Sequence, residues 1–489
     1  MIGNLSTAIN PPVLPTLDDI ERRCVELRNY QLDHPQQQSP LLSAEPPAQP
    51  PKRQLPANAP PPTPQEFSTP PRPRPPAELR LDEAALHGLA GSAVRTMAPH
   101  TEAHTAAILL QLLAVFGNVV GPGPHCMVGD TRHGLNLFVV LVGESSKARK
   151  GTSWNQIARL FSEVDRPWLD TRVTTARLTP SGLIYTLRDQ ESPPYRPQDR
   201  RLLALSEEFA SILQSLGRSS GQLSPLLRCA WDSGHLRTID RHRPVQATGV
   251  HFSLIGHITQ RDLEQHLPRT EAHNGFANRC LWTFVQRRKC LPEGGNLGSE
   301  ELSGIARELR RALDWAAGEK EILFRRDHAA RELWNDCYPT LSQARPGLYG
   351  AATSRAEAQV LRLSAIYAAL DCSPIVTLPH LQAALAVWEY CAAGAPLLFG
   401  TSTGDHTVDR IKEALDASPH GLTKTQIGAL FHGRFDSNTI DAALEQIMSL
   451  GKVTRYTEPT RGRPTTLWSV IPDVHEDPDQ DAQPPGEGA

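Results

Sequence analysis

The sequence predicts an α/β fold in which helices cover a largely parallel β-sheet, followed by a small C-terminal unit. Three observations predict this fold. Short apolar segments alternate with helical patterns across residues 131–345. The first of these segments leads through a glycine and a basic loop into the start of a helix. Residues 403–472 then show three helical patterns followed by two short strands.

Composition and charge limit the classes of protein that the chain can belong to. A net charge of −3 over 489 residues excludes a uniformly basic nucleic-acid binder, so nucleic-acid contacts would come from local patches. No apolar run has the length of a membrane span, and the first residues lack the pattern of a signal peptide. The eight cysteines form no C-x-x-C pair, which is typical of reduced thiols. We therefore expect a cytoplasmic protein with no membrane partner.

Proline and acidic residues mark the ends of the folded region. Residues 1–78 hold 19 of the 43 prolines, so we expect a disordered segment, either a solvated tail or a docking arm for a partner. The acidic residues 473–489 are expected to be a disordered tail. Between them we expect a helical part over 79–130, a core over 131–345, a second helical part over 346–402 and a separate unit over 403–472.

Four apolar segments are the candidate strands of the sheet. They cover residues 135–142, 201–209, 250–259 and 279–285. Continuous apolar runs of this length suit strands that are buried on both faces, as in parallel sheets. Polar residues follow several of them, and the carboxyl ends of parallel strands share one edge, where ligands bind in open α/β sheets.

The loop after the first strand is a candidate phosphate-binding loop (P-loop). Residues 135–154 read L-N-L-F-V-V-L-V-G-E-S-S-K-A-R-K-G-T-S-W. Backbone N–H groups at a helix start attract phosphate, a lysine neutralises it and a hydroxyl holds the metal ion. If Gly143 is the first glycine of the motif G-x-x-x-x-G-K-[ST], Ala148 occupies the position of the second glycine and Arg149 that of the lysine. If the loop is one residue longer than the motif, Lys150 occupies the lysine position. The candidate residues are Gly143, Lys147, Arg149, Lys150, Gly151, Thr152 and Ser153, with Thr152 near Mg²⁺. The alternative is a basic turn between a core strand and a helix.

Two further strands end in residues that suit a nucleotide site. Glu207 and Glu208 close the second strand, where one carboxylate, Glu207, would order Mg²⁺ and the other would polarise water. Their alternative role is to cap the next helix. His257 and Thr259 end the third strand and would contact the terminal phosphate, although a buried, hydrogen-bonded histidine explains His257 as well. Arg279 opens the fourth strand, either as a guanidinium supplied to a neighbouring subunit's nucleotide or as part of an ordinary surface salt bridge.

Residues 353–385, T-S-R-A-E-A-Q-V-L-R-L-S-A-I-Y-A-A-L-D-C-S-P-I-V-T-L-P-H-L-Q-A-A-L, resemble the helical lid of minichromosome-maintenance-type AAA+ helicases. This resemblance implies that residues 346–402 are a lid and that Arg355 is a sensor acting in trans. It also implies that Arg279, in A-N-R-C-L-W, is the arginine finger. Residues 86–400 further resemble helicase-like ATPases of phages, plasmids and integrated elements through H-G-L-A-G, N-L-F-V-V-L-V-G, R-K-G-T-S-W, S-E-E-F, I-G-H-I-T and N-G-F-A-N-R.

The C-terminal unit has the pattern of a winged helix. Helices are expected over 408–415, after Thr423 as N-cap, and over 437–450, followed by strands K-V-T-R-Y and T-T-L-W-S-V. Basic residues that would contact DNA phosphates lie on the wing: Lys452, Arg455, Arg461 and Arg463. The third helix carries Asp441 and Glu445 but no lysine or arginine, which argues against base reading and leaves a protein-interaction role open.

The loop and strand patterns predict a P-loop NTPase core, the resemblance implies that this core is of AAA+ type with a helical lid, and the C-terminal pattern predicts a winged helix. The expected function is that of a helicase or replication initiator of a mobile element. Such a protein would use ATP and Mg²⁺ and would act on single-stranded DNA or a replication fork. A homo-oligomeric ring is expected, because the finger and the sensor would act in trans, and priming would need a separate primase or replication protein. The alternative is a DNA- or protein-binding regulator that does not hydrolyse ATP and uses the fold as a scaffold or nucleotide switch.

Overall fold

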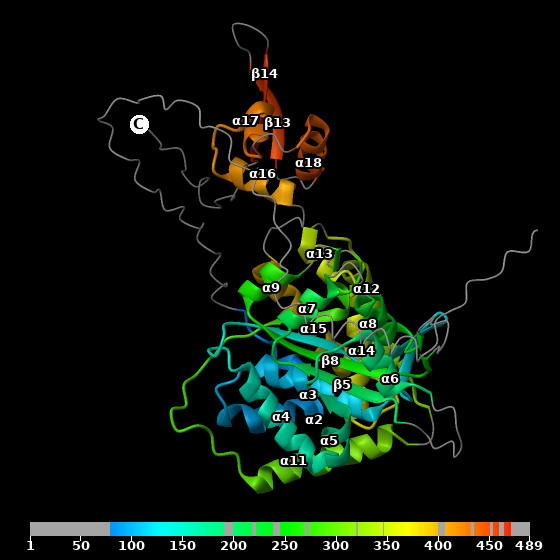
Figure 1. Ribbon diagram of the computed structural model, residues 1–489. Coiled ribbons are helices and arrows are strands. Elements are labelled where there is room, and N and C mark those ends of the chain that lie inside the picture. Colours follow the sequence, from blue (N-terminus) through cyan, green and yellow to red (C-terminus); the bar gives the residue numbers. More distant parts are fainter. Residues whose placement is uncertain are drawn as a thin grey trace, which may run out of the picture. The chain divides into compact units, whose positions relative to one another are not determined.

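The computed structural model describes most of the chain after residue 78 (Figure 1). The described ranges are 79–189, 199–217, 222–237, 245–267, 270–271, 274–318, 321–345, 347–399, 406–431, 435–449, 453–458 and 464–470. The predicted N-terminal segment 1–78 and the acidic tail 473–489 lie outside these residues.

Five parallel strands form the central sheet, in the order β4-β5-β8-β3-β9. They are β3 (Phe138–Val142), β4 (Val173–Thr174), β5 (Arg201–Ser206), β8 (His251–Ile258) and β9 (Cys280–Phe284). The four strands expected from the sequence are therefore confirmed as strands of one parallel sheet. Val142 pairs with Ile258 on one side and Phe284 on the other, so these three strands end level with one another.

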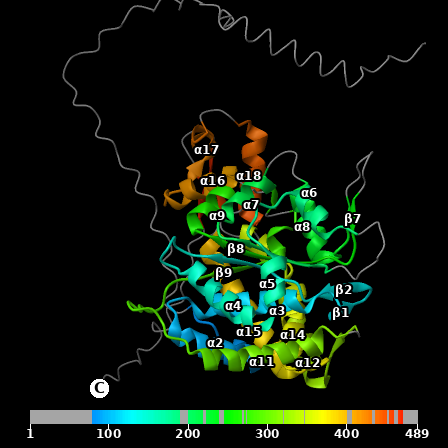
Figure 2. The same cartoon turned by 60° about the horizontal axis from the view of Figure 1, so that its bottom comes forward.

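Helices cover both faces of this sheet, because alternate strand residues enter two separate cores (Figures 1 and 2). Val139 and Leu141 pack into one core, and Phe138 and Val140 pack into the other. The first core receives α2 (Gly88–Met97), α3 (Thr105–Val120), α4 (Lys150–Val164), α5 (Arg166–Arg172) and α11 (Ser299–Ala316). The second receives α6 (Pro180–Leu187), α7 (Ala210–Leu216), α8 (Leu223–Asp232) and α9 (Gln260–His266).

The helices of the expected lid pack into these cores. α14 (Ala356–Leu370) is buried along nearly all its length and contributes to the core that contains α2 and α3. α15 (Leu378–Phe399) packs beside β9, with its first part in the same core and its last turn in the other. Most residues of α14 are apolar, and its buried Arg362 donates hydrogen bonds to the carbonyl oxygens of Asn136 and Trp231, which allows the helix to be buried on nearly every side. α13 (Gly347–Thr353) precedes it.

A second sheet joins strands from the predicted core with strands from both regions predicted to be helical, 79–130 and 346–402. Its order is β11-β10-β1-β2, with β1 (His125–Val128), β2 (Thr131–Gly134), β10 (Leu323–Arg326) and β11 (Ile375–Val376). Strands of two to four residues are too short for a clear periodicity, so the sequence did not reveal them. The remaining elements of this region are η1 (Glu83–Ala85), η2 (Ala98–His100), η3 (Ala277–Arg279), α12 (His328–Leu341) and the hairpin of β6 (Leu236–Arg237) and β7 (Gln246–Ala247).

The C-terminal unit has its own core, formed by three helices and a three-stranded antiparallel sheet. The elements are α16 (His406–Asp416), β12 (Leu422–Thr423), α17 (Lys424–Ala429), α18 (Ser437–Ser449), β13 (Val453–Glu458) and β14 (Thr465–Val470). Thr423 is the predicted N-cap of α17, and it forms a reciprocal capping box with Gln426. Ile411, Ile427, Ile447 and Trp468 join the helices to the sheet.

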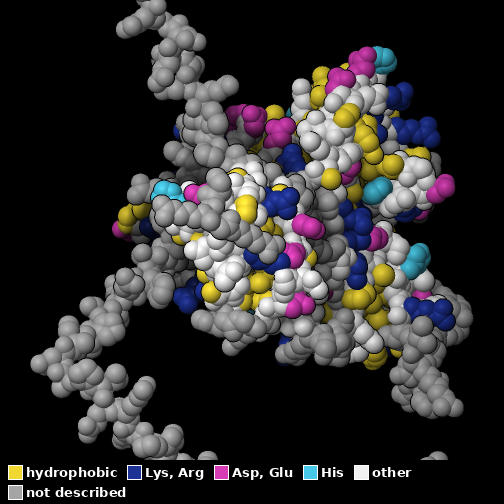
Figure 3. Space-filling view, turned by 90° about the horizontal axis from the view of Figure 1, so that it is seen from above, with side chains coloured by type: hydrophobic (Ala, Val, Ile, Leu, Met, Phe, Trp, Pro, Cys, Tyr) yellow, Lys and Arg dark blue, Asp and Glu magenta, His cyan; other side chains and the backbone are white. Residues whose placement is uncertain are grey.

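Charged side chains of both signs are interspersed with apolar ones over the face of the molecule in Figure 3. This mixture agrees with the small net charge of the chain. Among the described helices, none is long and apolar enough to cross a membrane.

Candidate functional site

A polar cavity of about 700 Å³ lies beyond the carboxyl ends of β3, β5 and β8. It is lined by Ser145, Ser146, Arg149, Lys150, Gly151, Thr152, Glu207, Glu208, Phe209, Ala210, Gln214, His257, Ile258, Thr259, Asp262 and His266. Three strands that are far apart in the sequence therefore bring most of the predicted nucleotide residues together.

The loop between β3 and α4 has an unusual backbone. Ser146 and Arg149 both adopt left-handed conformations, with φ of 56° and 54°. Non-glycine residues rarely adopt this conformation, and they concentrate at functional sites. Gly143 begins the loop, and a β-carbon added there would lie 2.2 Å from the Val285 carbonyl oxygen and 2.7 Å from the Ala148 β-carbon. This close approach explains why the position requires glycine.

Lys150 is the first residue of α4, and its side chain turns back over the loop. Its Nζ donates hydrogen bonds to the carbonyl oxygens of Gly143, at 2.8 Å, and Glu144, at 3.2 Å. Partial burial lowers the pKa of Lys150 to about 8, while the nearby Asp262 carboxylate opposes this shift. The ammonium group is therefore charged at neutral pH and lies at the edge of the cavity.

The N-terminus of α4 is open toward the cavity. Arg149 is its N-cap residue and makes no side-chain capping bond, so the backbone N–H groups of the first turn have no side-chain acceptor at the cap. Thr152, in this turn, is exposed and lines the cavity. Ser153 points the other way, because its buried hydroxyl donates to the Lys150 carbonyl at 2.6 Å. Of the two predicted hydroxyls, only Thr152 therefore faces the candidate site.

Two other predicted loop residues lie outside the cavity lining. Lys147 is exposed, and Gly143 is buried at the base of the loop. Gly151, in contrast, faces the carboxylates, since a β-carbon added there would be 3.8 Å from Glu207 Oε1.

Glu207 and Glu208 are both exposed at the cavity, directly after β5. The following helix α7 has Phe209 at its N-cap position and no side-chain capping bond, so neither glutamate has the capping role that the sequence left open. Asp262 adds a third carboxylate that the sequence reasoning missed. Its position three residues after Thr259 was the signal that could have revealed it, because this spacing is typical of helix caps.

His257 is buried, and burial together with Lys150 lowers its pKa to about 4, so the ring is neutral. Its Nε2 lies 3.3 Å from Gln111 Oε1. The Gln111 amide nitrogen donates to the Ala107 carbonyl and to the Ser153 hydroxyl, which leaves its oxygen as the acceptor. Therefore His257 Nε2 donates to Gln111, and its Nδ1 is a hydrogen-bond acceptor.

The Thr259 hydroxyl is engaged at the start of α9. It accepts from the Asp262 backbone N–H at 3.1 Å and donates to the Asp262 carboxylate at 2.6 Å. Thr259 thus forms part of the cavity wall, and its hydroxyl acts as a helix cap.

The two predicted trans-acting arginines lie at the opposite edge of the sheet. Arg279 directly precedes β9, so the length of five strand residues, roughly 15 Å, separates it from the cavity edge. It is buried and forms an ion pair with Asp232 at 2.5 Å. Arg355 also pairs with Asp232, at 3.5 Å, and its guanidinium lies 5.5 Å from the Trp231 ring. Arg279 therefore makes a salt bridge within its own chain, as one alternative expected, but the pair involves a buried guanidinium and not the surface arginine of that alternative.

Only part of the predicted DNA-contacting set falls within the described residues. Arg455 is exposed on β13. Lys452, Arg461 and Arg463 lie outside the described residues. On α18, Asp441 forms an ion pair with Lys424 of α17 at 2.5 Å.

A scan of the chain against models of known protein families finds no match, and a search of curated proteins finds no similar protein.

Proposed function

We propose that this chain is a cytoplasmic P-loop ATPase of AAA+ type that acts on DNA, as a helicase or replication initiator of a mobile element. One observation carries the proposal. An open helix N-terminus, the Lys150 ammonium group and the Glu207 and Glu208 carboxylates line a single cavity. This combination pairs sites for anions with ligands for a divalent cation, as ATP hydrolysis requires.

The order of the strands supports a ligand at this position. From the neighbouring strands β3 and β8 the chain continues in opposite directions along the sheet. After β3 it continues to β4 at one edge, and after β8 it continues to β9 at the other edge. The helices that follow, α4 and α9, pack against opposite faces. Such a reversal opens a crevice at the carboxyl ends of the strands, where open α/β sheets bind ligands.

The residues present fit ATP and Mg²⁺. The loop 143–149 with the first turn of α4 would hold the phosphates, and Thr152 and Glu207 would hold the metal ion. Mg²⁺, when bound, would neutralise charge on the phosphates.

The side chains of the cavity have distinct chemical capacities. The positively charged ammonium group of Lys150 can exchange its hydrogen bonds to the two loop carbonyls for a hydrogen bond to a phosphate oxygen. Glu208, exposed and beside Glu207, can accept a proton from water. His257 Nδ1 is an acceptor, so it suits a water molecule or hydroxyl better than a phosphate oxygen. This assignment changes the predicted role of His257 from phosphate contact to the orientation of water.

In this proposal the protein works as a homo-oligomeric ring. Arg355 is partly exposed, so a neighbouring subunit's nucleotide can reach its guanidinium. For Arg279 to act in trans, its ion pair with Asp232 would have to open. We expect Arg355 to be the stronger candidate for a contact between subunits.

The C-terminal unit is proposed to be a winged helix that engages DNA. Three helices, a two-stranded wing and the exposed Arg455 support this assignment. Single-stranded DNA or a replication fork is the proposed substrate, and a separate primase or replication protein would supply primers.

A second candidate function has its own support. Ala148 occupies the second glycine position of the P-loop, and Gly151 separates Lys150 from Thr152. These differences favour a loop that holds a nucleotide without hydrolysing it, so a DNA- or protein-binding nucleotide switch is the alternative. The absence of lysine and arginine from α18, which carries Glu445, favours a protein partner for that version.

ATP hydrolysis measured with and without single-stranded DNA tests the proposal. We expect DNA-stimulated turnover that is lost in Lys150→Ala and reduced at least about 100-fold in Glu208→Gln, as for removal of a general base. Nucleotide binding without turnover would support the switch. Turnover that survives in Lys150→Ala would exclude this cavity as the source of activity.

A further inference from the structure

Glu102, which no sequence pattern singled out, contacts the candidate phosphate loop from a different part of the chain. It lies in the loop between η2 and α3, and its side chain is only 13% exposed. Its Oε2 accepts a hydrogen bond from Arg149 Nε at 2.5 Å. Its Oε1 accepts from the Leu291 backbone N–H at 2.8 Å and lies 3.6 Å from Arg287 Nη1.

This contact leaves most of the Arg149 guanidinium available. Glu102 engages Nε, and within the described part of the chain neither Nη1 nor Nη2 of Arg149 has a hydrogen-bond partner. Arg149 also lines the cavity, beside Lys150. A guanidinium anchored through Nε presents its two terminal nitrogens as a fork, the geometry that binds phosphate in a bidentate manner.

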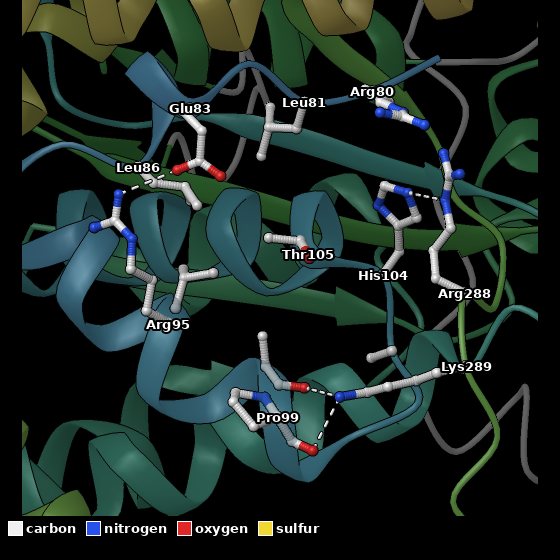
Figure 4. Close-up of a pocket in the computed structure, with 13 residues that line it drawn as sticks. Arg80, Leu81, Glu83, Leu86, Arg95, Pro99, His104, Thr105, Arg288 and Lys289 are labelled. Atoms are coloured by element: carbon white, nitrogen blue, oxygen red, sulfur yellow. Dashed lines mark hydrogen bonds and ion pairs between the residues drawn. The ribbon is translucent and has the colours of Figure 1, made fainter. Parts of the chain in front are cut away.

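The loop that carries Glu102 is fixed at both ends by the segment after β9 (Figure 4). At one end, Lys289 Nζ donates to the backbone carbonyls of Ala98 and Pro99. At the other, Arg288 Nε points toward the His104 ring, with the two nitrogens 3.3 Å apart. Since both ends are held, the Glu102 carboxylate has a defined position relative to the phosphate loop.

The carboxylate also remains charged. The Leu291 N–H is the largest contribution that lowers the pKa of Glu102 below its usual value, and Arg149 and Arg287 act in the same direction. At neutral pH, Glu102 therefore holds Arg149 through a charge-assisted hydrogen bond.

We propose that Glu102 is a positioning residue that holds Arg149 as a second phosphate-binding cation and thereby makes the cavity select triphosphates over diphosphates. This inference rests on the proposed nucleotide site. A cation placed beside Lys150 gains more from a ligand with a third phosphate, because each added negative charge increases the attraction. In this proposal, Glu102 orients the Arg149 guanidinium from a loop that is distant in the sequence. The irregular sequence of the phosphate loop does not provide this orientation by itself.

A double-mutant cycle tests this coupling in the full chain. Dissociation constants for Mg²⁺–ATP and Mg²⁺–ADP are measured for the unchanged protein, Glu102→Ala, Arg149→Ala and the double variant. We expect Glu102→Ala to weaken ATP binding roughly tenfold, the lower limit for a hydrogen bond to a charged group, and ADP binding less. In the Arg149→Ala background, the Glu102 substitution should change neither constant.

Two further variants separate positioning from folding. Glu102→Gln keeps only one oxygen acceptor, because its NH2 group replaces the other carboxylate oxygen, so it can accept from Arg149 or from Leu291 but not from both through separate atoms. We therefore expect an ATP affinity between those of the unchanged protein and Glu102→Ala. Arg287→Ala removes the other ion partner of Glu102 and leaves Arg149 in place, so the ratio of ATP to ADP affinity should not change. Thermal unfolding of each variant identifies any loss of the fold.

Several results would overturn the inference. An effect of Glu102→Ala that persists without Arg149 would mean that Glu102 acts only on its own loop. Tighter ATP binding in Glu102→Ala would mean that Glu102 holds Arg149 away from the phosphates. Equal weakening for ATP and ADP would remove the selectivity. If the unchanged protein binds neither nucleotide, the proposed function itself fails, whereas binding that depends on Lys150 but not on Glu102 defeats this inference alone.

Discussion

Nucleotide affinity should decrease as the pH rises through about 8, because partial burial lowers the pKa of Lys150 to that value. The direction of this change follows because the charged form of Lys150 is the one that binds phosphate. The charged ammonium group is present below the pKa and is lost above it. From a pKa of about 8, roughly nine tenths of Lys150 is charged at pH 7 and roughly one tenth at pH 9. If only the charged form binds, the affinity should fall about tenfold over this range.

Equilibrium titration of Mg²⁺–ATP at several pH values between 7 and 9.5 measures this effect. The terminal phosphate, with a second pKa of about 6, does not titrate in this range. Lys150→Arg is the matched control, because a guanidinium stays charged throughout and its affinity should not depend on pH. A flat profile for the unchanged protein, or the same slope in Lys150→Arg, would refute the assignment of Lys150 to the phosphates.

Three further predictions concern the loop, the buried network and the wing. Gly143→Ala places a methyl group against the backbone at Val285, so the free energy of unfolding measured in urea should decrease by about 1–3 kcal/mol. The affinity for nucleotide should decrease as well, and an unchanged free energy of unfolding would contradict the close approach. Gln111→Leu leaves His257 Nε2 without its acceptor and should lower the free energy of unfolding by about 1–3 kcal/mol in the same assay. An unchanged free energy of unfolding would contradict the hydrogen bond between Gln111 and His257. Arg455→Ala should reduce by about one the slope of log affinity for DNA against log salt concentration, and an unchanged slope would mean that this residue does not contact phosphate.

The strands and the C-terminal elements were predictable because each has a strong local signal. Val140 lies in a continuous apolar run, which is typical of strands buried on both faces. Thr423 precedes a helical pattern with glutamine at the capping-box position, so the start of α17 was visible in the sequence. The polar residues at the ends of β3, β5 and β8 then met at one edge, as expected for a parallel sheet.

The sequence could not show contacts that depend on packing between distant elements. Glu102 and Arg149 are 47 residues apart, and nothing in the local pattern of either indicates the other. Arg355 was assigned on resemblance, and Arg279 on its position at a strand start together with that resemblance, but both lie near Asp232, which the sequence did not mark. The short strands β1 and β10 pair across nearly 200 residues and have no periodicity of their own, so neither was predicted, and β1 fell within a part expected to be helical.

A crystal structure of the chain with Mg²⁺ and a non-hydrolysable ATP analogue tests the central claim most directly. We predict that the phosphates lie against residues 145–152, with Lys150 Nζ moved from the loop carbonyls to a phosphate oxygen and with Glu207 facing the metal ion. An analogue bound elsewhere while this cavity stays empty would contradict the nucleotide site on which the account depends.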